Sequence, residues 1–244
     1  MFSNKKILFT GATSGIGLAI LNKLLKEYYN IKITVLTRND YKNTDNIEYI
    51  YLDLSIDDSI IDLTLNETYD FVFFNAGVGI AEKNALKINF INHIKLFNHL
   101  QQFNNVNKES FIINTSSRRG LQYDNYTHEF IMRIKNNTLH LNKWNRFTQY
   151  CLSKKGNHAF TIYLTKLGFK AISVHPGAVN TKIFFGKKNI LYKSQKMFIP
   201  KFILISPLLS SSYFFEALNN FENGKISPNY SKECKNISNY IHLI

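Results

Sequence analysis

The chain has 244 residues, 45% of them hydrophobic, which is enough for a buried core and fits one domain. Two cysteines exclude a disulfide framework, no apolar run reaches the roughly 20 residues of a membrane-spanning helix, and without a signal-like segment we expect a cytoplasmic protein. The net charge of +13 comes from scattered lysines, which favours a solvated basic surface over binding to an anionic membrane or a nucleic acid.

Short apolar segments alternate along the chain with helical patterns. In chain order, the expected strands are Ile7–Thr10, Ile31–Leu36, Ile47–Leu52, Phe71–Asn75, Ser110–Asn114 and Lys170–Val174. The expected helices are Gly15–Tyr28, Asp57–Leu65, Asn84–Phe103 and Tyr150–Leu167, while the crossover from Thr37 to Asn46 is too short and polar for a full helix. This alternation predicts a single doubly wound parallel sheet, a Rossmann-type α/β domain over residues 1–244, which binds ligands at the carboxyl ends of its strands.

Two longer segments do not follow this alternation. Residues 118–148 are a polar and aromatic insertion before the last of these helices, and residues 182–207 are a basic, aromatic segment after Pro176 and Gly177. Both follow expected strand ends, so we expect lids or surface loops over the ligand crevice. For residues 182–207, a substrate lid, packing over the sheet edge and contact with anionic lipid all remain open.

A glycine-rich stretch from Thr10 to Gly17 joins the first strand to the first helix. Glycines let the backbone turn sharply and approach a pyrophosphate closely, and the helix N-terminus offers free N–H groups and a partial positive charge. Alone, the pattern is equally compatible with ordinary turn chemistry, so its meaning depends on the rest of the chain.

Tyr150 and Lys154 lie four residues apart at the start of an expected helix, so their side chains share one face. We expect the ammonium to lower the pKa of the phenol, which would make Tyr150 an acid or base near neutral pH. Ser117 ends the fifth strand, where it is placed to face the same crevice. Arg118 and Arg119 fit a solvated turn better than a contact to an anionic substrate.

Together these segments resemble the short-chain dehydrogenase/reductase superfamily over nearly the whole chain. The cofactor-binding residues that the resemblance implies are Gly11, Thr13, Ser14, Gly15, Ile16 and Gly17 in a Thr-Gly-x-x-x-Gly-x-Gly loop, Asp53 and Leu54, the motif Asn75, Ala76 and Gly77, and Pro176, Gly177, Val179 and Thr181. The catalytic residues that it implies are Ser117, Tyr150, Lys154 and Asn89, of which Tyr150 and Lys154 would also contact the cofactor. The Tyr-Cys-x-Ser-Lys segment and the long insertion before it are most similar to the retinol dehydrogenase-like branch.

The resemblance implies an oxidoreductase that exchanges a hydride between a nicotinamide and a small or hydrophobic carbonyl or alcohol substrate. In the reductive direction, Ser117 would hydrogen-bond the substrate oxygen while Tyr150 donates a proton. Lys154 would hold the nicotinamide ribose and tune Tyr150. Asn89 would position a water for the proton relay, although the interval from Asn75 to Asn89 is shorter than is usual in the family.

The cofactor preference depends on the end of the second strand. An NAD site usually has an acidic residue there for the ribose hydroxyls, whereas an arginine accommodates the 2′-phosphate of NADP. Arg38 therefore favours NADP(H) over NAD(H). Asp40, however, is close enough in sequence to bind the ribose hydroxyls instead, as in an NAD site.

Other functions stay open beside this one. An epimerase or dehydratase of the related extended group would favour a different glycine spacing and a larger C-terminal domain, and a non-catalytic cofactor-sensing protein would not need Ser117, Tyr150 and Lys154. The histidines and cysteines lack metal-ligand spacing, so we expect no metal site, and Cys151 is expected to be a packed thiol. The expected partner is a small-molecule substrate, with no nucleic acid; peripheral membrane contact and a homodimer stay open.

Overall fold

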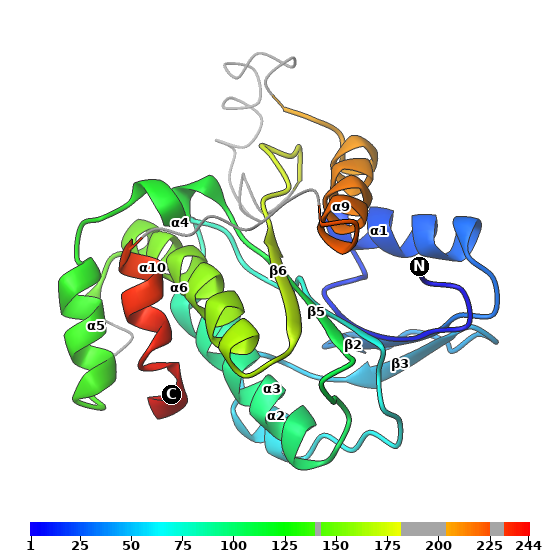
Figure 1. Ribbon diagram of the computed structural model, residues 1–244, viewed down its shortest axis with the longest axis horizontal. Helices are drawn as coiled ribbons and strands as arrows, with labels where there is room; N and C mark the ends of the chain where they lie inside the picture. The colour runs from blue at the N-terminus through cyan, green and yellow to red at the C-terminus, as the bar shows by residue number, and fades with distance from the viewer. Residues whose placement is uncertain (140–142, 182–203, 225–231) are drawn as a thin grey trace.

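The computed structural model describes residues 1–139, 143–181, 204–224 and 232–244 (Figure 1). Its sheet consists of β1 (Lys6–Thr10), β2 (Lys32–Thr37), β3 (Ile47–Tyr51), β4 (Phe71–Phe74), β5 (Phe111–Thr115) and β6 (Lys170–Val174). The strands are parallel and lie in the order β3-β2-β1-β4-β5-β6. This confirms the predicted doubly wound sheet, and each strand end lies within one residue of its expected position.

Helices precede and follow the strands along the chain. They are α1 (Gly15–Glu27), α2 (Asp58–Ile61), the π-helix η1 (Lys87–Ile91), α3 (Asn92–Gln102), α4 (Arg118–Gln122), α5 (Thr127–Lys135), α6 (Arg146–Lys166), α9 (Pro207–Glu222), α10 (Lys232–Ser238) and the 3₁₀-helix η4 (Ile241–Leu243). Thr37 to Asn46 contains no helix, as predicted. None of the helices within the described ranges is both long and apolar enough to cross a membrane.

The predicted insertion, residues 118–148, differs from the expected irregular loop because it contains α4 and α5. In α5, Thr127, Phe130 and Ile134 are buried at helical spacing, which gives this short helix one packed face. Helix α6 also begins earlier than predicted, at Arg146, because the Asn145 side chain accepts a hydrogen bond from the Thr148 backbone N–H at 2.9 Å.

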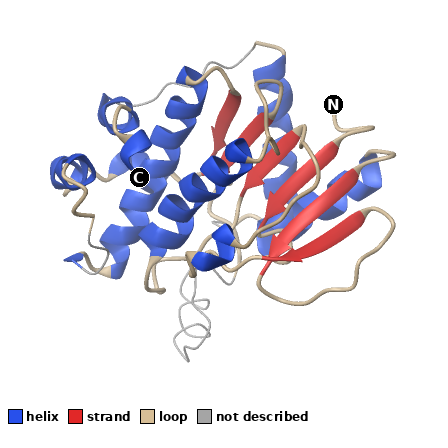
Figure 2. Cartoon of the chain, turned by 90° about the horizontal axis from the view of Figure 1, so that it is seen from below, coloured by secondary structure: helices blue, strands red, loops and turns tan. Residues whose placement is uncertain are grey.

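The sheet is covered by helices on both faces (Figure 2). Residues alternate along β1, so that Ile7 and Phe9 belong to one apolar cluster and Leu8 to another. The first cluster includes buried side chains of α1 and α9, and the second includes those of α3 and α6. Both faces are therefore buried, as the continuous apolar strands predicted.

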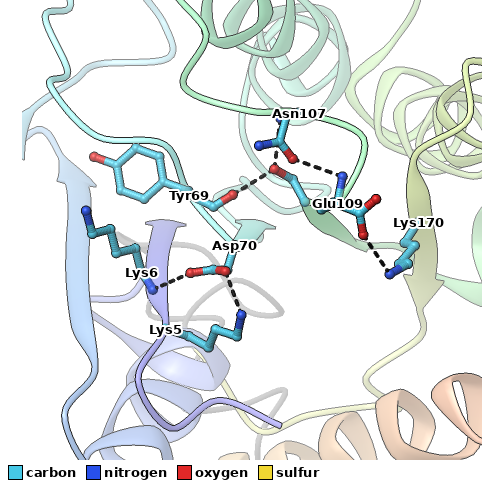
Figure 3. Close-up of polar contacts among 8 residues, drawn as sticks. Lys5, Lys6, Tyr69, Asp70, Asn107, Glu109 and Lys170 are labelled. Carbon is cyan, nitrogen blue, oxygen red and sulfur yellow. Dashed lines mark hydrogen bonds and ion pairs between the residues drawn. The ribbon is translucent and has the colours of Figure 1, made fainter.

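Polar contacts hold the amino ends of the central strands together (Figure 3). Asp70, just before β4, accepts hydrogen bonds from the Lys5 ammonium at 2.8 Å and from the Lys6 backbone N–H at 2.9 Å. Glu109, before β5, pairs with Lys170 of β6 at 3.4 Å. These contacts lie at the end of the sheet opposite to the expected ligand crevice, so we interpret them as structural.

The order of the strands reverses between β1 and β4, which are neighbours although β2 and β3 lie between them in sequence. Ligands of open α/β sheets bind at the carboxyl ends of the strands beside such a reversal. Most of the predicted lid, residues 182–203, lies outside the described residues. Of the remainder, Ile205 pairs with Val179, and Pro207 begins α9.

Candidate active site

The glycine-rich turn joins β1 to α1 at this reversal. Gly11 has a φ of +74°, and a Cβ atom there would lie 2.6 Å from the Ala76 Cα atom, so the position requires glycine. Ser14 precedes α1 and makes no side-chain hydrogen bond to its first turn. The first N–H groups of α1 therefore have no side-chain cap, which suits them to bind a phosphate.

Asn75 connects this turn to two other strands. Its Nδ2 atom donates to the Gly11 carbonyl at 3.0 Å, and its Oδ1 atom accepts from the Thr115 hydroxyl at 3.0 Å. The backbone N–H groups of Asn75 and Ala76 both donate to the Thr10 hydroxyl at 3.1 Å. The carboxyl ends of β1, β4 and β5 are thus held in one network, in which the part played by Thr115 was not predicted from the sequence.

The segment after β6 reaches the same turn. The Ser210 hydroxyl of α9 donates to the Pro176 carbonyl at 2.8 Å, and the Thr181 backbone N–H donates to the Val179 carbonyl at 2.8 Å. A Cβ atom at Gly15 would lie 3.3 Å from the Thr181 Cγ2 atom. The structure therefore brings together the predicted cofactor residues from the beginning and from the later part of the chain.

The residues predicted for the adenosine end of the cofactor follow β2 and β3. Arg38 and Asp40 are exposed, and within the described ranges neither belongs to an ion pair. Asp53 accepts a hydrogen bond from the Ser55 backbone N–H at 2.8 Å. Leu54 is buried, and its carbonyl accepts from the Asn92 side chain at 2.8 Å. These contacts fix the loop after β3. They do not decide whether Arg38 binds a 2′-phosphate or Asp40 binds the ribose hydroxyls.

Ser117 and Tyr150 meet at the carboxyl end of β5. Ser117 precedes α4, and its hydroxyl accepts a hydrogen bond from the Arg119 backbone N–H at 3.3 Å. The Ser117 side chain acts on the Tyr150 phenol and favours its ionised form. Burial raises the pKa of Tyr150, and this outweighs the opposing effects of the Ser117 side chain and of the Arg119 charge.

The predicted effect of Lys154 on Tyr150 is wrong in this structure, because the pKa of the phenol is raised rather than lowered. The Lys154 ammonium is 6.0 Å from the centre of the Tyr150 ring and donates instead to the Thr115 carbonyl at 3.0 Å. Burial also lowers the pKa of Lys154 to about 8. The two side chains lie near each other, as their spacing predicted, but burial is the main influence on the pKa of the phenol.

Asn89 lies in the π-helix η1 and is fully buried. Its Oδ1 atom accepts from the Val78 backbone N–H at 2.7 Å, and its Nδ2 atom donates to the Val78 carbonyl at 2.9 Å and to the Ser153 hydroxyl at 3.2 Å. The side chain therefore holds the loop after Gly77 against α6. Its predicted role in positioning a water stays a prediction.

A buried histidine, His158, lies behind Ser117 and Lys154. Its Nε2 atom is 2.7 Å from the Ser116 Oγ atom, and its Nδ1 atom is 2.9 Å from the Ser173 Oγ atom. The ring also hydrogen-bonds to the Ser117 backbone, and burial lowers its pKa to about 4. One sequence signal points to this histidine: His158 follows Lys154 by one helical turn and so shares its face of α6.

Two sequence interpretations concerned cysteine and metal chemistry. Cys151 is buried, and burial raises the pKa of its thiol to about 11, as expected for a packed thiol rather than a nucleophile. Within the part of the chain that the structure describes, no three His, Cys, Asp or Glu residues are grouped as metal ligands.

The fold is similar to those of solved dehydrogenases and reductases. A carbonyl reductase from chicken fatty liver, solved with NADPH, is 19% identical with a TM-score of 0.64, covering 90% of this chain and 92% of that one. A 3-alpha-hydroxysteroid dehydrogenase from Pseudomonas sp. B-0831, solved with NADH, is 18% identical with a TM-score of 0.64 and coverages of 88% and 89%. A short-chain dehydrogenase family protein from Francisella tularensis is 20% identical with a TM-score of 0.61 and coverages of 86% and 89%.

Comparisons of sequence give no further information, because no protein-family model and no curated protein matches the chain. At identities of 20% or less, the structural similarity establishes a shared fold. The function therefore has to be argued from the side chains of the site.

Proposed function

We propose that this protein is a nicotinamide-dependent oxidoreductase that interconverts a carbonyl and an alcohol. The observation that carries the proposal is the convergence of Ser117 and Tyr150, whose side chains interact, with the buried Lys154 ammonium 6.0 Å from the centre of the Tyr150 ring, near the Gly11 turn. Ordinary packing does not require a phenol, a hydroxyl and a buried ammonium to converge in a crevice. The solved proteins with this fold and a bound nicotinamide cofactor support the same function.

The residues present fit a dinucleotide. The turn from Gly11 to Gly17 would hold the pyrophosphate against the uncapped start of α1, and Lys154 would hold the nicotinamide ribose. When bound, the nicotinamide cofactor supplies the hydride in reduction and accepts it in oxidation. The segment from Pro176 to Thr181 would hold the amide of the nicotinamide.

Ser117 and Tyr150 are the residues proposed to protonate the substrate oxygen. The Ser117 hydroxyl orients the substrate oxygen, and the Tyr150 hydroxyl donates its proton to that oxygen as the hydride reaches the carbonyl carbon. Because burial raises the pKa of Tyr150, the phenol is protonated at neutral pH, which suits proton donation.

The proposed cofactor is NADP(H) in preference to NAD(H). Arg38 is exposed at the end of β2, where its guanidinium is available to a 2′-phosphate. Substitution of Arg38 by Asp should shift the ratio of the Michaelis constants toward NADH. If that ratio is unchanged, Arg38 does not determine the preference, and Asp40 becomes the next residue to substitute.

The activity is tested by NADPH oxidation with a panel of aldehydes and ketones that includes retinal, because the motif around Tyr150 resembles that of the retinol dehydrogenase-like branch. Turnover of a carbonyl compound supports the proposal. Tight NADPH binding without oxidation of any panel member would favour a cofactor-sensing protein instead. Sedimentation of the purified protein, with and without anionic vesicles, tests whether it forms a homodimer and whether it contacts a membrane peripherally.

A further inference from the structure

Two arginines lie beside the proposed catalytic pair. Arg118 and Arg119 are exposed and form the first turn of α4, directly after Ser117. The backbone N–H of Arg119 is fixed to the Ser117 hydroxyl at 3.3 Å. The position of this turn is set by Gly120, where a Cβ atom would lie 2.4 Å from the Lys154 carbonyl carbon, so α4 packs directly on α6.

The arginine charges act on groups in the crevice. The charge of Arg119 opposes the rise in pKa of both Tyr150 and Cys151, and the charge of Arg118 contributes to lowering the pKa of His175. Both arginines come from one turn that starts at the proposed active site.

A third arginine lies at the start of α6, the helix that carries Tyr150. Arg146 is exposed and lies one helical turn before Tyr150 on α6. It donates a hydrogen bond to the Ala81 carbonyl at 2.9 Å, in the loop that follows β4. Positive side chains thus approach the Tyr150 end of α6 from two different segments.

No carboxylate of the chain neutralises these arginines. Within residues 1–139, 143–181, 204–224 and 232–244, none of the three guanidinium groups forms an ion pair. The carboxylates nearest in sequence to α4 have other partners, since Asp124 binds Lys155 and Glu129 binds Arg133 and Lys143. The remaining segments of the sequence contain no Asp or Glu, so they supply no counter-ion either.

We propose that the substrate is an anionic carbonyl compound, whose carboxylate or phosphate pairs with Arg119 while its carbonyl oxygen meets Ser117 and Tyr150. Arginine suits this role because its planar guanidinium binds carboxylates and phosphates in a bidentate manner. The inference rests on the proposed function and narrows its substrate class. A solvated arginine turn, the alternative, would give no preference for charged substrates.

The test measures equilibrium binding to the complex of the protein with NADP⁺, which cannot reduce a carbonyl. Two matched pairs of probes are used: benzoylformate with its methyl ester, and dihydroxyacetone phosphate with dihydroxyacetone. We expect the anion of at least one pair to bind about 10-fold or more tightly than its neutral partner, and the pair that responds identifies carboxylate or phosphate. Equal binding within both pairs would overturn the inference.

Substitutions assign the preference to Arg119. Arg119→Gln should reduce the ratio of the affinity for the anionic probe to that for its neutral partner to near 1. Arg119→Lys should keep part of this ratio. In both variants the affinity for the neutral probe should not change. Lys235→Gln, which removes one exposed charge from α10, should keep the whole ratio. If Arg119→Gln, checked by circular dichroism, keeps the ratio as well, Arg119 is not the anion partner. Because no turnover is needed, this result is independent of whether NADPH oxidation confirms the proposed activity.

Discussion

The Nε2 atom of His158 lies 2.7 Å from the Oγ atom of Ser116, immediately behind the proposed catalytic serine. The Ser116 hydroxyl is also 3.2 Å from the Lys154 carbonyl. On the other side of the ring, the Nδ1 atom is 2.9 Å from the Oγ atom of Ser173. One neutral imidazole thus connects β6, α6 and the residue before Ser117.

This relationship predicts how substitutions of His158 behave. His158→Leu removes every hydrogen bond of the ring and should lower the free energy of unfolding by about 1–3 kcal/mol, because buried partners lose their bonds. His158→Gln can place an amide N–H near the same serine and should recover part of the stability and of kcat. Urea unfolding and steady-state kinetics check both. Equal losses in the two variants would show that ring packing matters more than the hydrogen bonds.

The phosphate-binding turn is tested by a pair of glycine substitutions. Gly11→Ala places a methyl group 2.6 Å from the Ala76 Cα atom and should weaken NADPH binding by about 10-fold or more, because the turn must shift. Gly224→Ala is the matched control, since Gly224 has a similar φ of +66° but no atom within 4 Å of the added methyl. Binding is followed by NADPH fluorescence. The same loss in both variants would mean that backbone strain alone is responsible.

Lys154 makes the free energy of unfolding depend on pH. Its pKa is about 8 when folded and about 10.5 when unfolded, so the folded state disfavours the charged form. This destabilisation is fully present below pH 8 and is relieved as the pH rises toward 10.5. Lys154→Met should therefore stabilise the protein most at neutral pH.

Urea unfolding of the wild type and of Lys154→Met measures this effect. From the two pKa values, the difference in free energy of unfolding between Lys154→Met and the wild type should shrink by roughly 2 kcal/mol between about pH 7 and pH 9.5. Comparing the two proteins at each pH removes the contributions of the tyrosines, which titrate in both. A difference that is constant with pH would show that Lys154 is charged at little cost in the folded state.

Much of the fold could be predicted because the strands are continuous apolar segments. Ile7 and Phe9 face one helical layer and Leu8 faces the other, so both faces of β1 had to be apolar. Helices α5 and α9 were not predicted, because Thr127 and Ser210 are buried polar residues that interrupt the apolar pattern. Their positions depend on tertiary packing, which local sequence does not contain.

The site could be predicted as far as its residues lie in local motifs. The turn at Gly11 and the pair of Tyr150 and Lys154 have recognisable spacing, whereas the contacts of His158 join segments far apart in the chain. The predicted influence of Lys154 on Tyr150 was wrong because helical spacing gives proximity but not burial, and burial dominates the pKa of the phenol.

The central claim is hydride transfer assisted by Tyr150. Its most direct test uses NADPH that carries deuterium at its transferable position, together with a carbonyl substrate found in the panel, and mass spectrometry of the alcohol product. We expect deuterium on the former carbonyl carbon. We also expect Tyr150→Phe to lose about 100-fold or more of the rate with unchanged NADPH affinity. Product without deuterium, or a Tyr150→Phe variant as fast as the wild type, would contradict it.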